Sequence, residues 1–252
     1  MSLFRLDRLI ADHSGYSRSE VKKLLRGGAV AVDGTVETNG ERKLDPGTVS
    51  VRVDGTVLDM RPHRYLIMNK PAGVVSSTDD PRDRTALDLL PETYRRFSLF
   101  PAGRLDKDAE GLLLLTDDGQ FCHNVISPKK NVRKIYYIET EAAFLQEDTE
   151  RFASGLTLSD GSVCRPAELR PLRREKPAAL VAVCEGKYHQ VKRMAAAVGK
   201  PVTYLRRVAI GALALPEGLE PGHAEEIGAE RAASVFLPPP ELATLEKGAW
   251  LP

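Results

Sequence analysis

Residues 103–119 read GRLDKDAEGLLLLTDDG, in which four consecutive leucines, Leu112–Leu115, lie between two groups of acids. Turn-forming residues bound the leucines on both sides, which predicts a short buried strand rather than a helix. The acids also match the ligand spacing of a calcium-binding EF-hand loop. The stretch therefore has two interpretations: a calcium site, or one catalytic aspartate among solvated loop residues.

The residues around these acids argue against calcium. An EF-hand loop follows a helix and ends in a bidentate glutamate. Here Pro101 and Gly103 exclude an incoming helix, and the shorter Asp117 stands at the last ligand position. What remains is Asp106, held between a proline and a buried strand. Taken alone, such a residue is more often an ordinary turn aspartate, and the sequence predicts no metal site.

The composition narrows the class of protein. Of 252 residues, 42% are hydrophobic and 28% charged, which is ordinary for a globular chain. No apolar stretch approaches the roughly 20 residues that span a bilayer, and the N-terminus lacks the apolar core of a signal peptide. Three scattered cysteines without a CxxC pair indicate reduced thiols. We therefore expect a cytoplasmic protein with no membrane partner and, because no heptad pattern occurs, a monomer.

Positive charge is concentrated in parts of the chain. Residues 217–252 hold seven glutamates and two basic residues, so the preceding 216 residues carry a net charge of +6. Basic residues cluster without acids in 129–134 and 187–207. Such clusters indicate a polyanionic partner such as nucleic acid, or alternatively solvated charged faces. Phosphate-loop, dinucleotide-binding and serine-elbow signatures are absent from the sequence.

Residues 1–58 predict a small module of two helices followed by short strands. The apolar stripe of the first helix consists of Leu3, Leu6, Leu9 and Ile10. Ser17 and Glu20 predict a capping box that starts the second helix. The second helix carries Arg18, Lys22 and Arg26 at a spacing of four, so these cations share one face. Asp-Gly pairs at 33–34 and 54–55 predict two hairpin turns.

Residues 59–64 are the predicted linker, because their proline disfavours helix. A second domain is expected over 65–237, followed by a loose, proline-rich tail over 238–252. Helices are predicted only around 141–154 and 188–198. Strands are predicted for RYLIMNKP, SLFPAG, GLLLLT, KIYYIET and ALVAVCE. The pattern predicts an α+β fold with a mixed, mainly antiparallel sheet.

Four motifs occur in a fixed order along the chain: NKPAGVVSS at 69–77, GRLDKDAEGLLLLTDDG at 103–119, KIYYI at 134–138 and EGKYHQVKRMAAAVGKPV at 185–202. In this order they resemble the RsuA-type pseudouridine synthases, and the N-terminal module resembles the S4 RNA-binding domain that precedes the catalytic domain in that branch. The resemblance covers about residues 1–215. It implies isomerisation of a uridine to pseudouridine in ribosomal RNA, with neither cofactor nor metal.

The resemblance also implies roles for single residues. Asp106 would be the catalytic carboxylate, which attacks C1′ or C6 of the uridine or assists otherwise. Tyr136 would stack on the extruded uracil and serve in proton transfer, whereas Tyr137 points to the opposite side of the strand, into the core. Lys192 would pair with Asp106 and keep it ionised. Asp108 and the other nearby acids would be loop and turn residues.

The resemblance also implies which residues bind RNA and which residues shape the cleft. Arg104 would contact the flipped nucleotide. The other expected RNA-binding residues are Arg18, Lys22, Arg26, Lys129, Lys130, Arg133, Lys187 and Arg193. The expected cleft-shaping residues are Asn69, Lys70, Gly73, Gly103 and Leu105. The segments GKYHQVKRM and DDGQFCHNVISP resemble the corresponding segments of the family's enzymes that act on 16S ribosomal RNA. A 23S enzyme of the same family and a non-catalytic RNA-binding assembly protein are the alternatives.

Overall fold

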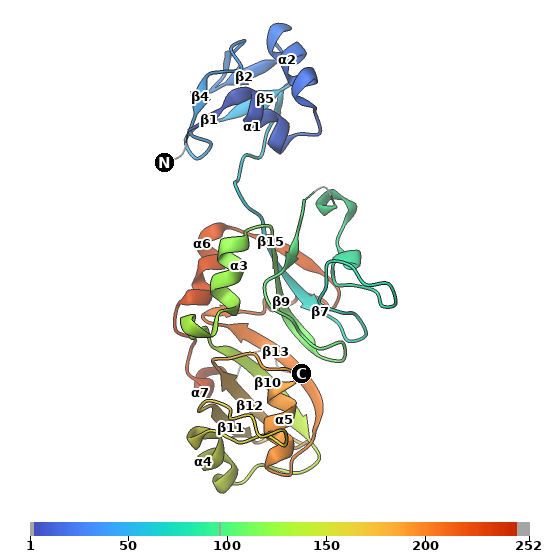
Figure 1. Ribbon diagram of the computed structural model, residues 1–252, viewed down its shortest axis with the longest axis vertical. Coiled ribbons are helices and arrows are strands. Elements are labelled where there is room, and N and C mark those ends of the chain that lie inside the picture. Colours follow the sequence, from blue (N-terminus) through green and yellow to red (C-terminus); the bar gives the residue numbers. More distant parts are fainter. Residues whose placement is uncertain (1–2, 96, 246–252) are drawn as a thin grey trace. The chain divides into compact units, whose positions relative to one another are not determined.

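The chain divides into two compact units, residues 1–62 and 63–252, as the computed structural model in Figure 1 shows. The structure describes residues 3–95 and 97–245. The division between Pro62 and His63 lies within the predicted linker segment. None of the helices in the described ranges is long and apolar enough to cross a membrane.

The N-terminal unit packs two helices, α1 (Leu6–His13) and α2 (Arg18–Arg26), against short strands. Four strands form a sheet in the order β3-β2-β5-β6. Their bounds are Val30–Val32 for β2, Thr35–Val36 for β3, Val51–Val53 for β5 and Thr56–Val57 for β6. A separate pair joins β1 (Phe4–Arg5) to β4 (Lys43–Leu44). Apart from β1 and β4, which were not predicted, this confirms the predicted order of elements.

The predicted start of α2 is confirmed. The Glu20 amide donates to the Ser17 hydroxyl at 3.4 Å, and the Ser17 amide donates to the Glu20 carboxylate at 2.7 Å, which completes the capping box. Along α2, the side chains of Arg18, Lys22 and Arg26 are all exposed. The helix therefore presents the basic face that its spacing predicts.

One expectation for α1 is wrong. Leu3 is 62% exposed, because the helix begins only at Leu6, after β1. The rest of the apolar stripe, Leu6, Leu9 and Ile10, is buried in the core of the unit.

The C-terminal unit is built on a nine-stranded sheet with the order β11-β12-β10-β13-β9-β7-β15, which β8 and β14 extend at β9 and β13. The bounds are β7 Tyr65–Lys70, β8 Phe100–Pro101, β9 Glu110–Thr116, β10 Lys134–Thr140, β11 Glu168–Leu172, β12 Ala178–Val183, β13 Val202–Ile210, β14 Leu213–Ala214 and β15 Ala224–Ile227. Among the described strands of this sheet, β13 and β9 alone pair in parallel. The predicted mixed, mainly antiparallel α+β fold is confirmed.

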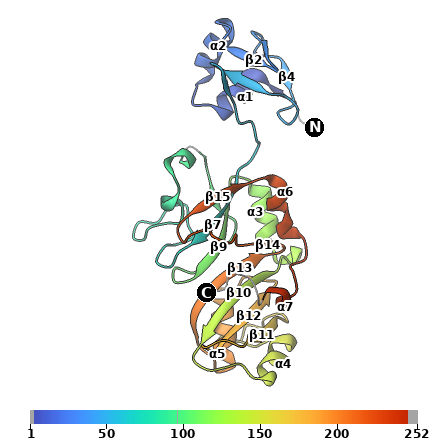
Figure 2. The same cartoon turned by 180° about the vertical axis from the view of Figure 1, so that it is seen from behind.

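Helices cover both faces of this sheet. They are α3 (Gly119–Ile126), α4 (Gln146–Ser154), α5 (Gln190–Ala197), α6 (Ala229–Ala233) and α7 (Leu242–Leu245). Short 3-10 turns span Leu87–Leu89, Glu92–Tyr94, Pro128–Lys130 and Ser234–Phe236. On one face α4 and α5 share an apolar core with β10 and β12. On the other, α3 and α6 lie side by side and pack with β7 and β9 (Figures 1 and 2).

Two parts of the helical prediction are corrected. Helix α3 was not among the predicted helices, and Asp118, expected as a turn residue, caps it by accepting a hydrogen bond from the Phe121 amide at 2.9 Å. The expected loose tail also contains structure: Leu242 and Leu245 are 2% and 6% exposed, because α7 packs onto β10 and β12. Residues 246–252 of that tail lie outside the described residues.

Gly111 lies where β9 pairs with β13, which is where the two halves of the sheet meet. Its φ is +99°, and a Cβ at this position would lie 2.2 Å from the Arg207 carbonyl oxygen. Strands β9 and β13 pair only here, over two residues each. Next to the pairing, the buried Arg207 side chain donates from Nε to the Leu112 carbonyl at 2.8 Å. The missing side chain of Gly111 therefore allows β9 to meet β13.

We expect Gly111→Ala to lower the free energy of unfolding by about 3 kcal/mol, because a backbone–backbone clash adds to a disfavoured φ. Thermal and denaturant unfolding measure the change. Gly119→Ala is the matched control, since nothing lies within 4 Å of a Cβ there. Equal stability of the two variants would show that β9 and β13 tolerate separation.

Candidate active site

One small open cavity in the C-terminal unit brings together the loop between β8 and β9, strands β10 and β12, and the start of α5. Asp106, Tyr136 and Lys192 all line it, with Arg104 and Leu105 beside them. The structure thus places the three predicted catalytic residues in one site. They come from three separate segments, so only the fold brings them together.

The Lys192 ammonium binds two aspartates. Its Nζ lies 3.2 Å from Asp106 Oδ2 and 2.6 Å from Asp108 Oδ1. The Asp106 side chain is 27% exposed and that of Asp108 is 75% exposed. The geometric pairing of Lys192 with Asp106 is present as expected. Asp108 lies in a turn as expected, and it is in addition the nearer partner of the lysine.

The contact between Lys192 and Asp108 shifts the pKa of both groups. Burial alone lowers the pKa of Lys192, but the hydrogen bonds and charges of Asp108 and Asp106 outweigh burial and raise it above its usual value. The hydrogen bond from Lys192 in turn lowers the pKa of Asp108. At neutral pH the site therefore contains a fixed ammonium beside the Asp108 carboxylate.

His189 is a site residue that the sequence analysis missed. Its Nε2 lies 3.5 Å from Asp106 Oδ1, and its ring lines the cavity. A sequence signal existed: His189 stands three residues before Lys192, a spacing that places both on the same side of a helix start.

The loop that carries Asp106 is clamped on its N-terminal side by Ser76. The Leu105 amide donates to Ser76 Oγ, and Ser76 Oγ donates to the Leu105 carbonyl, both at 3.0 Å. Ser76 is only 5% exposed. A single buried hydroxyl therefore holds both backbone groups of the residue that precedes Asp106.

Lys70 clamps the other side of the loop. Its fully buried Nζ donates to the carbonyl oxygens of Ala109 at 2.7 Å, Pro71 at 3.0 Å and Lys107 at 3.3 Å. The Gly73 amide donates to the same Lys107 carbonyl at 2.8 Å. Burial lowers the pKa of Lys70 to about 8, while three carbonyl acceptors match the three hydrogens of an ammonium group.

Of the expected cleft-shaping residues, Leu105 alone lines the cavity. Lys70 and Gly73 act from behind the loop, and Gly103 has a φ of +97°, which a glycine adopts readily. The expectation for Asn69 is wrong: its Nδ2 donates to the Leu219 carbonyl at 2.7 Å and so fixes a turn next to β15.

Strand alternation on β10 places the two tyrosines as predicted. Tyr137 is 2% exposed and lies in an apolar cluster with α7. Tyr136 is half-buried and lines the cavity with Val183 and Leu205. An aromatic ring beside a carboxylate offers both a stacking surface and a polar edge.

The expected RNA-binding cations of this unit fall into two groups. Arg104, Lys129 and Lys130 are exposed. The others have partners within the protein. Arg133 pairs with Glu168 at 2.6 Å, Arg193 with Asp160 at 2.5 Å, and Lys187 with Glu185 at 3.7 Å and with the Val163 carbonyl. The expectation that these three bind RNA stays a prediction, and each of them already has an acidic partner within the protein.

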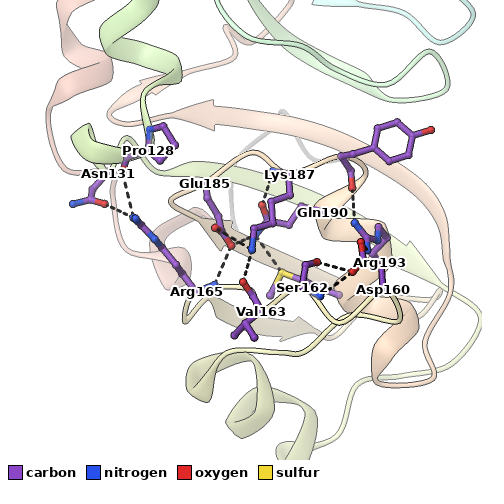
Figure 3. A network of polar contacts seen from close by, with 12 residues as sticks. Pro128, Asn131, Asp160, Ser162, Val163, Arg165, Glu185, Lys187, Gln190 and Arg193 are labelled. Carbon is purple, nitrogen blue, oxygen red and sulfur yellow. Dashed lines mark hydrogen bonds and ion pairs between the residues drawn. The ribbon is translucent and has the colours of Figure 1, made fainter.

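Figure 3 shows how these contacts join the loop around 160–165 to the segment 185–193. The buried Glu185 is at the centre: its Oε1 accepts from the Arg165 amide at 3.0 Å and from Gln190 Nε2 at 2.7 Å. Gln190 Oε1 accepts from the Lys187 amide at 2.9 Å. The network fixes the cavity wall that precedes α5.

Comparison with known proteins gives the same assignment. The sequence pattern described as RNA pseudouridylate synthase matches residues 64–197, and that of the S4 domain matches residues 4–50. The chain is 44% identical over 229 residues to "Uncharacterized RNA pseudouridine synthase YtzG" of Bacillus subtilis, covering 90% of this chain and 95% of that protein.

Other relatives are similar over nearly their whole length. "Ribosomal small subunit pseudouridine synthase A" of Escherichia coli K12 is 40% identical over 233 residues, covering 92% of this chain and 99% of that protein. A crystal structure of a pseudouridylate synthase superposes with a TM-score of 0.64 at 32% identity, covering 92% of this chain and 99% of the other. The chain has an S4 domain followed in the sequence by a unit whose cavity holds a carboxylate, a tyrosine and a lysine, and it belongs to the RNA pseudouridylate synthase family.

Proposed function

We propose that this protein converts a uridine of small-subunit ribosomal RNA to pseudouridine, with Asp106 as the catalytic carboxylate. The observation that carries the proposal is the clamped Asp106 beside Lys192 and Tyr136 in a single cavity. The relatives whose names specify the small ribosomal subunit support the choice of RNA.

The reaction suits a site of this composition. The N1–C1′ bond of the uridine breaks, the base turns, and C5 bonds to C1′. The C5 hydrogen leaves as a proton and N1 gains one, so the isomerisation is redox-neutral. A carboxylate can serve as the nucleophile, at C1′ or at C6, or assist bond cleavage and proton removal. Lys192 fixes the carboxylate and counters its charge.

Tyr136 and Arg104 are proposed to hold the extruded nucleotide. Taking a base out of its stack costs a few kcal/mol, which contacts in the pocket must offset. The Tyr136 ring offers a stacking surface for the uracil. Arg104 is exposed at the rim, where a phosphate is accessible to it.

The S4 domain is proposed to supply affinity without sequence selection. Arg18, Lys22 and Arg26 form an exposed row along α2. Cations in such a row contact phosphates, which position a protein on RNA but do not read its bases.

The proposal is tested by incubating the protein with protein-free RNA of each ribosomal subunit, then mapping pseudouridine by primer extension after carbodiimide treatment. We expect a new stop at one position in the small-subunit RNA. A stop confined to large-subunit RNA would assign the chain to the alternative substrate. No stop in either RNA, or in the early particles of either subunit, would contradict the proposal.

Ser76 is expected to act as a positioning residue. Ser76→Ala removes both hydrogen bonds to Leu105, so the Asp106 loop shifts and kcat falls by about 10- to 100-fold, while KM stays within about twofold. Steady-state kinetics of pseudouridine formation separate the two parameters. Ser77→Ala is the matched control, because the Ser77 hydroxyl donates to the Asp79 carbonyl at 2.7 Å and accepts from the Asp79 amide at 3.4 Å, away from the loop of Asp106. Equal kcat in the two variants would show that the Ser76 clamp is dispensable.

A further inference from the structure

Tyr188 and His189 form a stacked pair of rings beside the cavity. Their ring centroids are 3.8 Å apart and their planes differ by 18°. His189 faces the cavity, with Nε2 3.5 Å from Asp106 Oδ1. The stack therefore runs outward from the catalytic carboxylate through His189 to Tyr188.

Tyr188 is unusually open to solvent. At 76% it is the most exposed large apolar side chain in the described residues, and within residues 3–95 and 97–245 its hydroxyl has no hydrogen-bond partner. Since His189 covers one face of the ring, the opposite face is the open one. An open aromatic face beside the cavity is available for a ligand to stack on.

The backbone at His189 adopts a conformation that is unfavourable for histidine. His189 occupies the N-cap of α5 with φ +48°, and its side chain makes no capping bond to the described backbone. Asp33 and Asp54, which share this left-handed conformation, lie in hairpin turns that require it. Serine, threonine, asparagine or aspartate would stabilise an N-cap better than histidine. Such locally disfavoured choices concentrate at binding sites.

Tyr188 is nevertheless held in place. Arg193 Nη1 donates to the Tyr188 carbonyl at 3.4 Å, and Asp160 fixes the same guanidinium at 2.5 Å. Figure 3 shows Arg193 and Asp160 joined to Ser162 in this wall of the cavity. A ring on a fixed backbone loses little conformational freedom when a ligand stacks on it.

The surroundings identify the ligand class. Lys187 and Lys192 line the same cavity but are paired with acids, whereas Arg104 is an exposed cation of the lining, where a phosphate is accessible to it. A flat open ring near the exposed Arg104 guanidinium suits a nucleobase flanked by phosphates, as in proteins that bind single-stranded nucleic acid. We propose that the outer face of Tyr188 stacks against an unpaired nucleobase adjacent to the extruded uridine. This inference deepens the proposed function and rests on it for the identity of the RNA.

The test is the affinity of the full-length protein for protein-free small-subunit RNA at several salt concentrations. Tyr188→Leu keeps apolar bulk but removes the ring, and we expect it to raise Kd by about 5- to 100-fold. Tyr188→Phe keeps the ring and should restore the affinity to within about twofold. The slope of log Kd against log salt should stay unchanged in both variants, because no phosphate contact is lost. Leu145→Ala, which truncates another exposed apolar side chain (54%), controls for nonspecific loss of surface.

Three results would overturn the proposal. Tyr188→Leu with wild-type Kd would show that nothing stacks there. A raised Kd with a shallower salt slope would mean that a phosphate contact had been lost instead. An effect seen only with a particle that contains ribosomal proteins would assign Tyr188 to a protein contact. Because binding needs no turnover, an effect on Kd without any pseudouridine formation would refute the proposed function but leave the stacking site intact.

Discussion

Asp106→Asn is expected to abolish pseudouridine formation, lowering the rate by about 10⁴-fold or more, because an amide is neither a nucleophile nor a base. The substitution keeps the shape of the side chain. Lys192 retains its 2.6 Å contact with Asp108, so the cavity wall stays in place. Nucleoside analysis of the RNA by mass spectrometry measures the product, and a melting temperature within a few degrees of wild type shows that the variant is folded.

Asp108→Asn is the matched control for this prediction. It removes the other carboxylate that binds Lys192, from a side chain that is 75% exposed. We expect Asp108→Asn to retain most of the activity. If Asp108→Asn were inactive and Asp106→Asn active, the roles of the two aspartates would be reversed.

Lys192→Gln is expected to have the second largest effect, lowering kcat by about 10²-fold, because the carboxylate loses the cation that fixes it. Lys192→Arg keeps the charge and should recover part of the activity, although a guanidinium fork binds carboxylates with a different geometry. Steady-state kinetics on the mapped RNA compare the three proteins.

A second measurement distinguishes loss of the Lys192 ion pair from a general loss of structure in the variant. The hydrogen bond from Lys192 lowers the pKa of Asp108, so Lys192→Gln should raise that pKa, and Lys192→Arg should keep it low. A carboxyl NMR titration measures both. An unchanged pKa of Asp108 in Lys192→Gln would show that the pair does not exist in solution.

Local signals explain why much of the fold was predictable. The capping box at Ser17, the Asp-Gly turns and the buried run Leu112–Leu115 each act over a few residues, and all three were placed correctly. The alternation of β10 likewise separated Tyr136 from Tyr137 without knowledge of the sheet order. The motif resemblance, rather than spacing, singled out Asp106 and Lys192.

Several contacts that were not foreseen join distant segments of the chain. Arg133 and Arg193 were predicted as RNA-binding residues, and their acidic partners, Glu168 and Asp160, become neighbours only when the chain folds. Similarly, α7 follows three prolines and is buried because β10 and β12 form a surface for it. No pattern within a short window reveals such partners.

Release of tritium from small-subunit RNA labelled at uridine C5 follows the reaction directly, because C5 loses its hydrogen when it bonds to C1′. We predict that the wild-type protein releases tritium in step with the appearance of pseudouridine at a single position, and that Asp106→Asn releases none. Absence of release by the wild-type protein, or equal release by Asp106→Asn, would contradict the assignment of this cavity as a pseudouridine synthase site with Asp106 at its centre.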